Sequence, residues 1–271
     1  MPELPEVETT RLGLLPHILG RRIEKVIVRE RRLRWPIPPD IEQQLAGCTV
    51  QDARRLGKYL LLDCDKGSLL LHLGMSGRLR MVPASQMYGK HDHVDIVLDN
   101  EMTMRFTDPR RFGAFLWAGD DPLAHPLLTG LGLEPLDESL SGAWLYGSTR
   151  GAKVAIKLWL MDSKRITGIG NIYANEALFR AGIHPLRPAG RIALLRFGRL
   201  AAAIQDTLRS AIEAGGSTLR DFVDANGKPG YFQQQYCVYS RAGLPCLVCG
   251  THIKLVRQSG RATYFCPACQ R

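Results

Sequence analysis

The fold of the C-terminal end is decided by Cys246-Leu247-Val248-Cys249 and Cys266-Pro267-Ala268-Cys269, two cysteine pairs separated by sixteen residues. Four thiolates on two such turns, with a hairpin between them, can surround one tetrahedral ion, which is the arrangement of a zinc ribbon. Redox or iron–sulfur use of the same thiols is the alternative. Because a site closed by four sulfurs leaves no open position for a substrate, the spacing predicts one structural Zn²⁺ ion held by Cys246, Cys249, Cys266 and Cys269.

A β-hairpin is expected between the two cysteine pairs. Its strands should cover 253–256 and 262–265, with Gln258-Ser259-Gly260 turning between them and Arg261 just beyond the turn. An arginine in that position can reach a groove of nucleic acid, although ribbons also make purely structural turns.

The charge of the chain favours a polyanionic partner. Lys and Arg outnumber Asp and Glu by 36 to 26, which gives a net charge of +10 and a pI near 9.5. Nucleic acid and an anionic membrane surface both suit this charge. No apolar run approaches the roughly 18 residues of a membrane span, and the acidic start of the chain is unlike a secretory signal. We therefore expect a cytoplasmic protein with reduced thiols, in which the isolated Cys48, Cys64 and Cys237 fill cores.

The hydrophobic pattern changes along the chain from β to α. After a first helix, short apolar runs separated by turn residues predict an antiparallel sandwich or barrel with strands at 23–28, 49–54, 58–63, 68–73, 93–98, 102–107 and 113–117. The stretch 130–151 is rich in Gly, Pro and Ser and predicts a linker with one short helix at 140–146 and a domain boundary near residue 133. Helical periodicity then predicts helices at 154–161, 171–181 and 191–213.

The N-terminal residues suit either a nucleophile or an ordinary helix start. An initiator Met before Pro2 is normally removed, which would leave a secondary amine beside Glu3. An α-amino group has a pKa of about 8, so part of it is unprotonated at neutral pH and can act as a nucleophile. Pro5 and the acidic residues after it fit the first turn of a helix, with Leu4, Val7, Leu14 and Ile18 on one face. The same residues are also typical of a capped helix with no chemical role.

Several loops combine cations, aromatics and glycines in ways that suit nucleic acid. Gly168-Ile169-Gly170-Asn171 lacks the third glycine of a dinucleotide fingerprint, and it suits either a phosphate seat at a helix start or a plain interhelical turn. Arg110 beside Phe112 fits a wedge inserted into a duplex or a solvated basic turn, and Met75 fits a second wedge or a core plug. Lys90-His91-Asp92-His93 offers no clear third metal ligand, so we expect hydrogen bonds or phosphate contacts there.

Together these motifs resemble the bacterial formamidopyrimidine-DNA glycosylases, the bifunctional repair enzymes for oxidised purines. The resemblance spans nearly the whole chain. It rests on seven motifs in order: Pro2 to Thr9, His72 to Gly77, Lys90 to His93, Thr107 to Gly113, Gly170 to Ala174, Gly227 to Phe232, and the cysteine ribbon containing Arg261.

The resemblance implies an α+β fold of two domains. An N-terminal helix and antiparallel β-sandwich would form the catalytic domain at 1–133. A helix-two-turns-helix DNA-binding domain with a lesion-capping loop would follow at 134–239, and a zinc ribbon at 240–271. The expected partner is double-stranded DNA that contains an oxidised purine or an abasic site. We expect a monomer in the bacterial cytoplasm, associated with the nucleoid and not with a membrane.

The resemblance also supplies residue roles. Pro2 would attack C1′ of the damaged nucleotide and form an iminium, Glu3 would shuttle a proton, and Lys58 and Arg261 would assist β- and δ-elimination. The expected DNA contacts are made by His72, Met75, His91, Arg110, Phe112, Lys153, Lys157 and Asn171, of which Met75, Arg110 and Phe112 would fill the space of the everted nucleotide. Ser217 and Thr218 are candidates for contact with the base.

Two other functions remain open. The related endonuclease VIII branch shares Pro2, Glu3 and the ribbon but prefers oxidised pyrimidines. The start of the chain, the Arg110-Arg111-Phe112 loop and the long segment 217–239 favour the purine branch. A non-catalytic zinc-ribbon protein would bind DNA with strong salt dependence and would not cut it.

Overall fold

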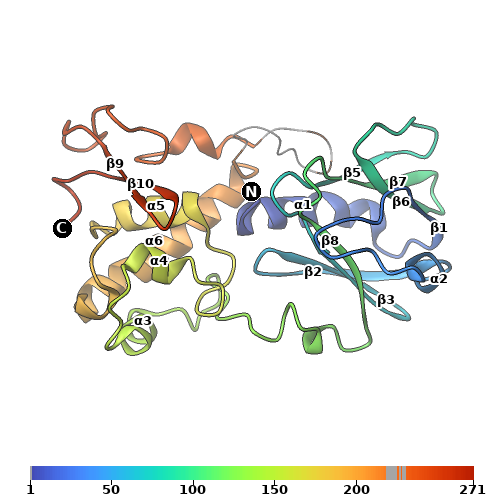
Figure 1. Cartoon of the computed structure of the whole chain (residues 1–271), viewed down its shortest axis with the longest axis horizontal. Coiled ribbons are helices and arrows are strands. Elements are labelled where there is room, and N and C mark those ends of the chain that lie inside the picture. The colour runs from blue at the N-terminus through green and yellow to red at the C-terminus, as the bar shows by residue number, and fades with distance from the viewer. Residues whose placement is uncertain (1, 218–224, 226, 228–229) are drawn as a thin grey trace. The chain divides into compact units, whose positions relative to one another are not determined.

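The computed structural model describes residues 2–217, 225, 227 and 230–271, so Thr218 lies outside the described residues. The chain forms two compact units (Figure 1). The first contains Met1–Gly130 and Ala214–Tyr231, and the second contains Leu131–Glu213 and Phe232–Arg271. The segment Ala214–Tyr231 therefore returns to the first unit.

Helix α1 (Leu4–Ile18) begins at the capping residue Glu3. The Glu6 carboxylate accepts the backbone N–H of Glu3 at 2.8 Å, and the Glu3 side chain accepts the backbone N–H of Glu6, which forms a capping box. Pro5 lies in the first turn, where no amide donor is needed. The apolar face expected from the sequence is confirmed, since Leu4, Val7, Leu14 and Ile18 are all buried.

Two antiparallel four-stranded sheets form the described core of the first unit and confirm the expected sandwich. One has the order β1 (Ile23–Val28), β6 (Asp92–Leu98), β7 (Met102–Thr107), β5 (Arg78–Pro83). The other has the order β2 (Val50–Leu56), β3 (Tyr59–Cys64), β4 (Gly67–His72), β8 (Ala114–Gly119). Helix α1 contacts β2 and β3 of one sheet and β5 of the other, so it closes a core that both sheets line (Figure 1).

Two elements of the first unit were not expected from the sequence. Strand β5 alternates Arg78, Leu79 and Arg80 and pairs with β7 at the edge of its sheet, so its apolar signal in the sequence is weak. Helix α2 (Ile41–Leu45) has a single turn, which is too short for a helical repeat of apolar residues to be recognised in the sequence. A short 3₁₀ turn, η1 (Pro122–Ala124), follows the last strand.

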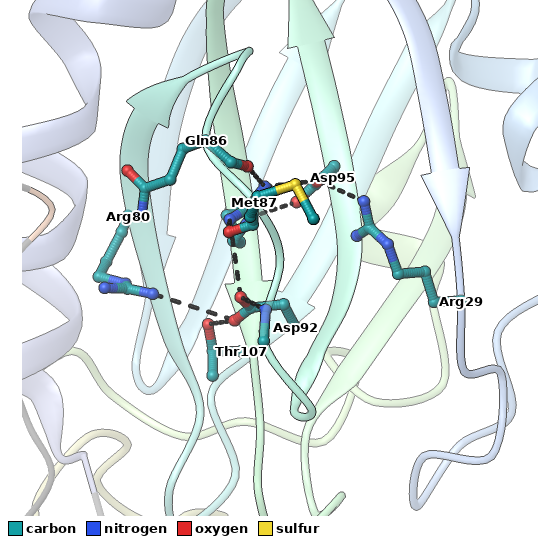
Figure 2. Close-up of polar contacts among 9 residues, drawn as sticks. Arg29, Arg80, Gln86, Met87, Asp92, Asp95 and Thr107 are labelled. Atoms are coloured by element: carbon teal, nitrogen blue, oxygen red, sulfur yellow. Dashed lines mark hydrogen bonds and ion pairs between the residues drawn. The ribbon is translucent and has the colours of Figure 1, made fainter.

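A buried ionic cluster fastens the loop between β5 and β6 to the sheet (Figure 2). Arg105 on β7 is 2% exposed and binds Asp95 on β6, with its Nε 2.8 Å from the carboxylate. Its other guanidinium nitrogens donate to the backbone carbonyls of Met87 and Gln86 at 2.9 and 3.0 Å. Asp92 accepts the backbone N–H of Gly89 at 2.8 Å from the same loop. These contacts fix the loop that leads into His91.

The second unit is helical and carries the ribbon. Its elements are α3 (Gly142–Thr149), α4 (Ile156–Leu160), α5 (Asn171–Arg180), η2 (Ala189–Arg191), α6 (Leu194–Glu213), η3 (Phe232–Gln235), β9 (Lys254–Gln258) and β10 (Arg261–Phe265). Helix α6 packs against α3 and α5, and β10 packs against α5 (Figure 1). The helices expected at 140–146, 154–161, 171–181 and 191–213 are confirmed with shifted ends. In the part of the chain that the structure describes, no helix is long and apolar enough to cross a membrane.

Candidate active site and nucleic-acid interface

The start of α1 holds the expected nucleophile in a fixed, buried setting. Pro2 is buried, and Glu3 is 3% exposed. The Glu6 carboxylate uses one oxygen for the backbone N–H of Glu3 and the other for the backbone N–H of Ser217, each at 2.8 Å. The same side chain therefore joins the helix start to Ser217, which the sequence proposed as a base contact. The role of Glu6 was not expected, although its position three residues after Glu3 is the signal of a capping box.

Lys58 lies in the turn between β2 and β3, beside the first turns of α1. Arg55, near the end of β2, donates to the Glu8 carboxylate on α1 at 3.0 Å and to the carbonyl of Gly57 at 3.2 Å. These bonds join the turn to the helix that begins after Pro2. Lys58 itself is half-buried.

His72 ends β4 as a neutral imidazole close to this turn. Its ring lies 4.8 Å from that of Tyr59, which pairs with it across β3 and β4. Burial, together with the positive charges of Lys58 and Arg34, lowers the pKa of His72 to about 4. Its Nδ1 accepts the backbone N–H of Gly74 at 3.0 Å, so the proton of the neutral ring lies on Nε2. His72 can thus donate a hydrogen bond but brings no positive charge at neutral pH.

The three expected wedge residues lie on two loops of the first unit and are exposed. Met75 follows β4 and is 40% exposed, and Phe112 lies before β8 and is 42% exposed. The Arg110 guanidinium lies 4.9 Å from the centre of the Phe112 ring. His91 is half-buried and precedes β6. The structure therefore brings Met75, Arg110 and Phe112 to neighbouring loops, as wedges would require.

In the second unit, the expected phosphate contacts lie in different environments. Asn171 is the first residue of α5, preceded by Gly168 with φ +83° and by Gly170 as the cap. Backbone amides at the N-terminus of a helix point along its axis toward the preceding loop, where they can bind a phosphate. Lys153 is exposed. Lys157 is fully buried, and its Nζ donates to the carbonyl of Ala262 at 2.8 Å and to Thr263 Oγ1 at 2.7 Å. Lys157 was expected to contact phosphate, and in the structure its ammonium points into the protein toward β10.

The ribbon brings its four cysteines together. Their sulfur atoms all lie within 4.8 Å of one another, with Cys246 and Cys269 at 3.9 Å and Cys249 and Cys266 at 3.5 Å. Thiolates bound at about 2.3 Å to one tetrahedral ion would lie about 3.8 Å apart, so the four residues fit Zn²⁺. Cys48 and Cys64 lie in the first core as expected from the sequence, and burial raises the pKa of Cys64 to about 12. Cys237 is only half-buried and packs against the apolar cluster beside the ribbon.

Arg261 lies where the hairpin turn ends. Ser259 and Gly260 both have positive φ, at 47° and 76°, which suits a tight two-residue turn between β9 and β10. Arg261 pairs with Gln258 across the turn and is exposed. The tip of the ribbon thus presents a cation to solvent, as the sequence predicted.

One residue that fixes the ribbon was missed by the sequence reasoning. Glu176 on α5 is fully buried and accepts the backbone N–H groups of Cys237, Val238 and Tyr239 at 2.9, 3.0 and 2.8 Å. Its partners lie about sixty residues away, and nothing in the local pattern of α5 distinguishes it from a solvated glutamate.

Known proteins match this chain over both units. Three family models match: the formamidopyrimidine-DNA glycosylase N-terminal domain at residues 1–115, the H2TH domain of the same glycosylase at 131–223, and the zinc finger found in FPG and IleRS at 243–271. A formamidopyrimidine-DNA glycosylase of Methylococcus capsulatus is 56% identical over the full length of both chains. The chain belongs to the formamidopyrimidine-DNA glycosylase family.

Solved structures of formamidopyrimidine-DNA glycosylases agree with the model. The MutM (FPG) protein of Thermus thermophilus is 38% identical, with a TM-score of 0.89 over 99% of this chain and 98% of that one. A complex of Lactococcus lactis Fpg with DNA containing an abasic site is 32% identical, with a TM-score of 0.92 over 99% of each chain. These relatives confirm the α+β fold with a helix-two-turns-helix domain and a cysteine ribbon, and they identify the chain as a DNA glycosylase.

Proposed function

We propose that this member of the family removes 8-oxoguanine and formamidopyrimidines from double-stranded DNA and then cleaves the strand at the abasic site. The observation that supports this most is the start of α1, where the buried Pro2 and Glu3 precede a capped helix whose Glu6 also holds Ser217. Full-length identity of 56% to a glycosylase of this name agrees with it.

The reaction would begin at the amine that Pro2 exposes after removal of Met1. Its lone pair forms a bond to C1′ of the damaged nucleotide while the glycosidic bond breaks, and the base leaves with those bonding electrons and takes up the proton that the Pro2 nitrogen releases. Glu3 delivers a proton to the sugar ring oxygen, the ring opens, and an iminium joins Pro2 to C1′. The iminium acidifies C2′, so loss of a proton there breaks the C3′–O bond, and a second elimination breaks the C5′–O bond. Lys58 would assist the first elimination and Arg261 the second.

Base excision from a duplex also requires extrusion of the damaged nucleotide. Extrusion costs a few kcal/mol, which side chains inserted into the stack help to offset. Met75, Arg110 and Phe112 would serve this purpose, with Arg110 reading the opposite cytosine. His72, His91, Asn171 and Lys153 would contact the backbone, and Ser217 would contact the everted base, as would Thr218.

Zinc would have a structural role. One Zn²⁺ ion bound by Cys246, Cys249, Cys266 and Cys269 would close the ribbon and hold Arg261 at its tip. We expect about one zinc per chain in the purified protein, and Cys266→Ser to lose most of it together with δ-elimination. Retention of zinc by Cys266→Ser at the wild-type level would contradict this assignment. We also propose that the protein acts in the cytoplasm at the bacterial nucleoid, as a monomer.

Borohydride trapping tests the central step. Borohydride added while the enzyme acts on a duplex with 8-oxoguanine opposite cytosine should reduce the iminium and leave a covalent protein–DNA adduct. Pro2→Gly should lower the adduct yield by at least about tenfold, because a primary amine replaces the preorganised ring. Wild-type protein that forms no adduct would instead support a protein that only binds DNA.

A second duplex, with thymine glycol opposite adenine, separates the purine branch from the endonuclease VIII branch. We expect the single-turnover excision rate to be higher on 8-oxoguanine opposite cytosine. A clear preference for thymine glycol would contradict the proposed substrate class while leaving the Pro2 chemistry intact.

A further inference from the structure

Two loops of the first unit, residues 73–77 and 108–113, carry the three proposed wedges and touch through their backbones. Gly74 has a φ of +61°, and a Cβ at this position would lie only 2.4 Å from the carbonyl carbon of Phe112. A side chain at position 74 is therefore excluded, and the backbones of the two loops lie in direct contact there.

A single buried carboxylate bonds to both loops. Asp108 is fully buried, and its two oxygens accept the Ser76 hydroxyl and the backbone N–H of Gly113, each at 2.8 Å. The Ser76 oxygen in turn accepts the backbone N–H of Arg110 at 3.1 Å. Ser76 follows Met75, and Gly113 follows Phe112. Each proposed wedge is thus at most one residue away from a group that bonds to Asp108 or to Ser76.

The backbone of Asp108 also bonds to residues at the start of β6. Its N–H donates to the carbonyl of His91 at 3.0 Å, and its carbonyl lies 2.8 Å from Nε2 of the buried His93. His91 is a proposed phosphate contact and ends the loop that Arg105 fastens to the sheet. The position of Asp108 is therefore fixed from the β6 side as well.

Burial of this carboxylate is costly in free energy. Both groups that donate to its side chain, a hydroxyl and a backbone amide, are neutral, and a carboxylate out of water is expensive even when it is hydrogen-bonded. A neutral residue in a loop interior would avoid that cost. Among side chains of this length, only that of Asp has two acceptor oxygens. One oxygen bonds to each loop segment, so the carboxylate joins the two loops.

We propose that Asp108 is a positioning residue for base extrusion and for recognition of the opposite base. It holds Met75, Arg110 and Phe112 as one rigid group, so that insertion into the stack and reading of the opposite cytosine occur together. This inference rests on the proposed function of those three residues. It predicts that Asp108 affects the steps that need the wedges more than the chemistry at Pro2.

Asp108→Asn is the direct test, because asparagine keeps the size but offers one acceptor oxygen where two are used. Ser76→Ala is the second variant, since it removes the hydroxyl between Asp108 and Arg110 while the Asp108–Gly113 bond remains. A comparison pair exists at the β3–β4 hairpin, where the half-buried Asp63 accepts the Ser68 hydroxyl at 2.6 Å at the end of β4 away from Met75, and also pairs with Arg54. Ser68→Ala is the control for Ser76→Ala, because it removes a hydroxyl from a carboxylate–hydroxyl pair, and Asp63→Asn reports what loss of one of the two oxygens of a structural carboxylate does to this fold.

Three single-turnover rates are compared: excision of 8-oxoguanine opposite cytosine, excision opposite adenine, and cleavage of a preformed abasic site opposite cytosine. For Asp108→Asn and Ser76→Ala we expect excision opposite cytosine to fall about tenfold and abasic cleavage less than about threefold. The cytosine-to-adenine ratio should fall at least about threefold. Fluorescence of 2-aminopurine placed beside the lesion should report slower extrusion in both variants. The two control variants should change all rates by less than about twofold.

An equal loss of all three rates in Asp108→Asn and Ser76→Ala would overturn the proposal, because it would mean a general structural role. Wild-type rates in both variants would overturn it as well. If Asp108→Asn does not fold, Ser76→Ala decides alone. Failure of the proposed function is recognised separately, since wild-type protein would then neither excise 8-oxoguanine nor form a borohydride adduct.

Discussion

Separate replacement of Lys153 and Lys157 by glutamine tests which of these lysines binds DNA. Both were expected to contact phosphate, and they lie four residues apart, but their environments are opposite. Lys153 is exposed, whereas Lys157 is fully buried with its Nζ bonded to Ala262 and Thr263 on β10. A cation that neutralises a phosphate must reach solvent, so we expect Lys153→Gln to weaken DNA binding and Lys157→Gln to weaken the ribbon.

The size of both effects follows from these contacts. A hydrogen bond to a charged group contributes about 1.5–3 kcal/mol, so the two bonds of Lys157 contribute about 3–6 kcal/mol. The ammonium also has a desolvation cost of several kcal/mol that glutamine does not carry, which offsets part of this gain. We expect Lys157→Gln to lower the free energy of unfolding of the second unit by about 2 kcal/mol, and its melting temperature by about 5–10 °C. Lys153→Gln should leave stability unchanged and reduce the salt slope of DNA binding by about 0.9, the value for one phosphate contact.

Two measurements on the same proteins separate the roles. Thermal unfolding is followed with zinc present, and DNA affinity is measured by fluorescence anisotropy from 50 to 200 mM salt on a duplex with an abasic-site analogue. Lys157→Gln should keep the wild-type salt slope. If its slope instead falls by about 0.9 while its melting temperature stays at the wild-type value, Lys157 is a phosphate contact and the reasoning from burial is wrong.

Two further predictions concern the first unit. The pKa of His72 is lowered from its ordinary value of about 6.5 to about 4. Between these two pH values the unfolded chain binds a proton at His72 and the folded protein does not. The free energy of unfolding therefore falls as the pH drops from about 6.5 to about 4. His72→Gln should make urea unfolding less pH-dependent there by about 3 kcal/mol, and parallel profiles for the two proteins would contradict the lowered pKa. Arg105→Met removes the buried partner of Asp95 and should lower the free energy of unfolding by about 3–5 kcal/mol in urea titrations, whereas a loss below about 1 kcal/mol would mean that the cluster in Figure 2 is not a strong contact.

Sequence reasoning succeeded where the signal is local. The buried face of α1, most strands, the four helices of the second unit and the cysteine ribbon all repeat within a window of a few residues or at a fixed spacing. It failed at β5, where Arg78 and Arg80 interrupt the apolar alternation of an edge strand, and at α2, which has only one turn. The residues proposed for the N-terminal site and the wedge loops come from motifs and stay predictions, and the structure adds their environment.

The residues that sequence reasoning missed or placed differently are buried charges. The sequence gives no signal that Glu6, Asp108, Lys157 or Glu176 is buried, because charged residues are almost never fully buried without partners. Each of them bonds to at least one group that lies 32 to 211 residues away along the chain: Ser76 for Asp108, Cys237 to Tyr239 for Glu176, Ala262 and Thr263 for Lys157, and Ser217 for Glu6. No local window contains both members of such a pair. Each of these charges fastens a segment that carries, or leads to, a proposed DNA contact, and a buried charge is retained only where its bonds offset its desolvation. Residues that position the proposed DNA contacts are therefore to be sought among the buried charges of this fold. Among these four charges, Asp108 is linked to the most proposed contacts.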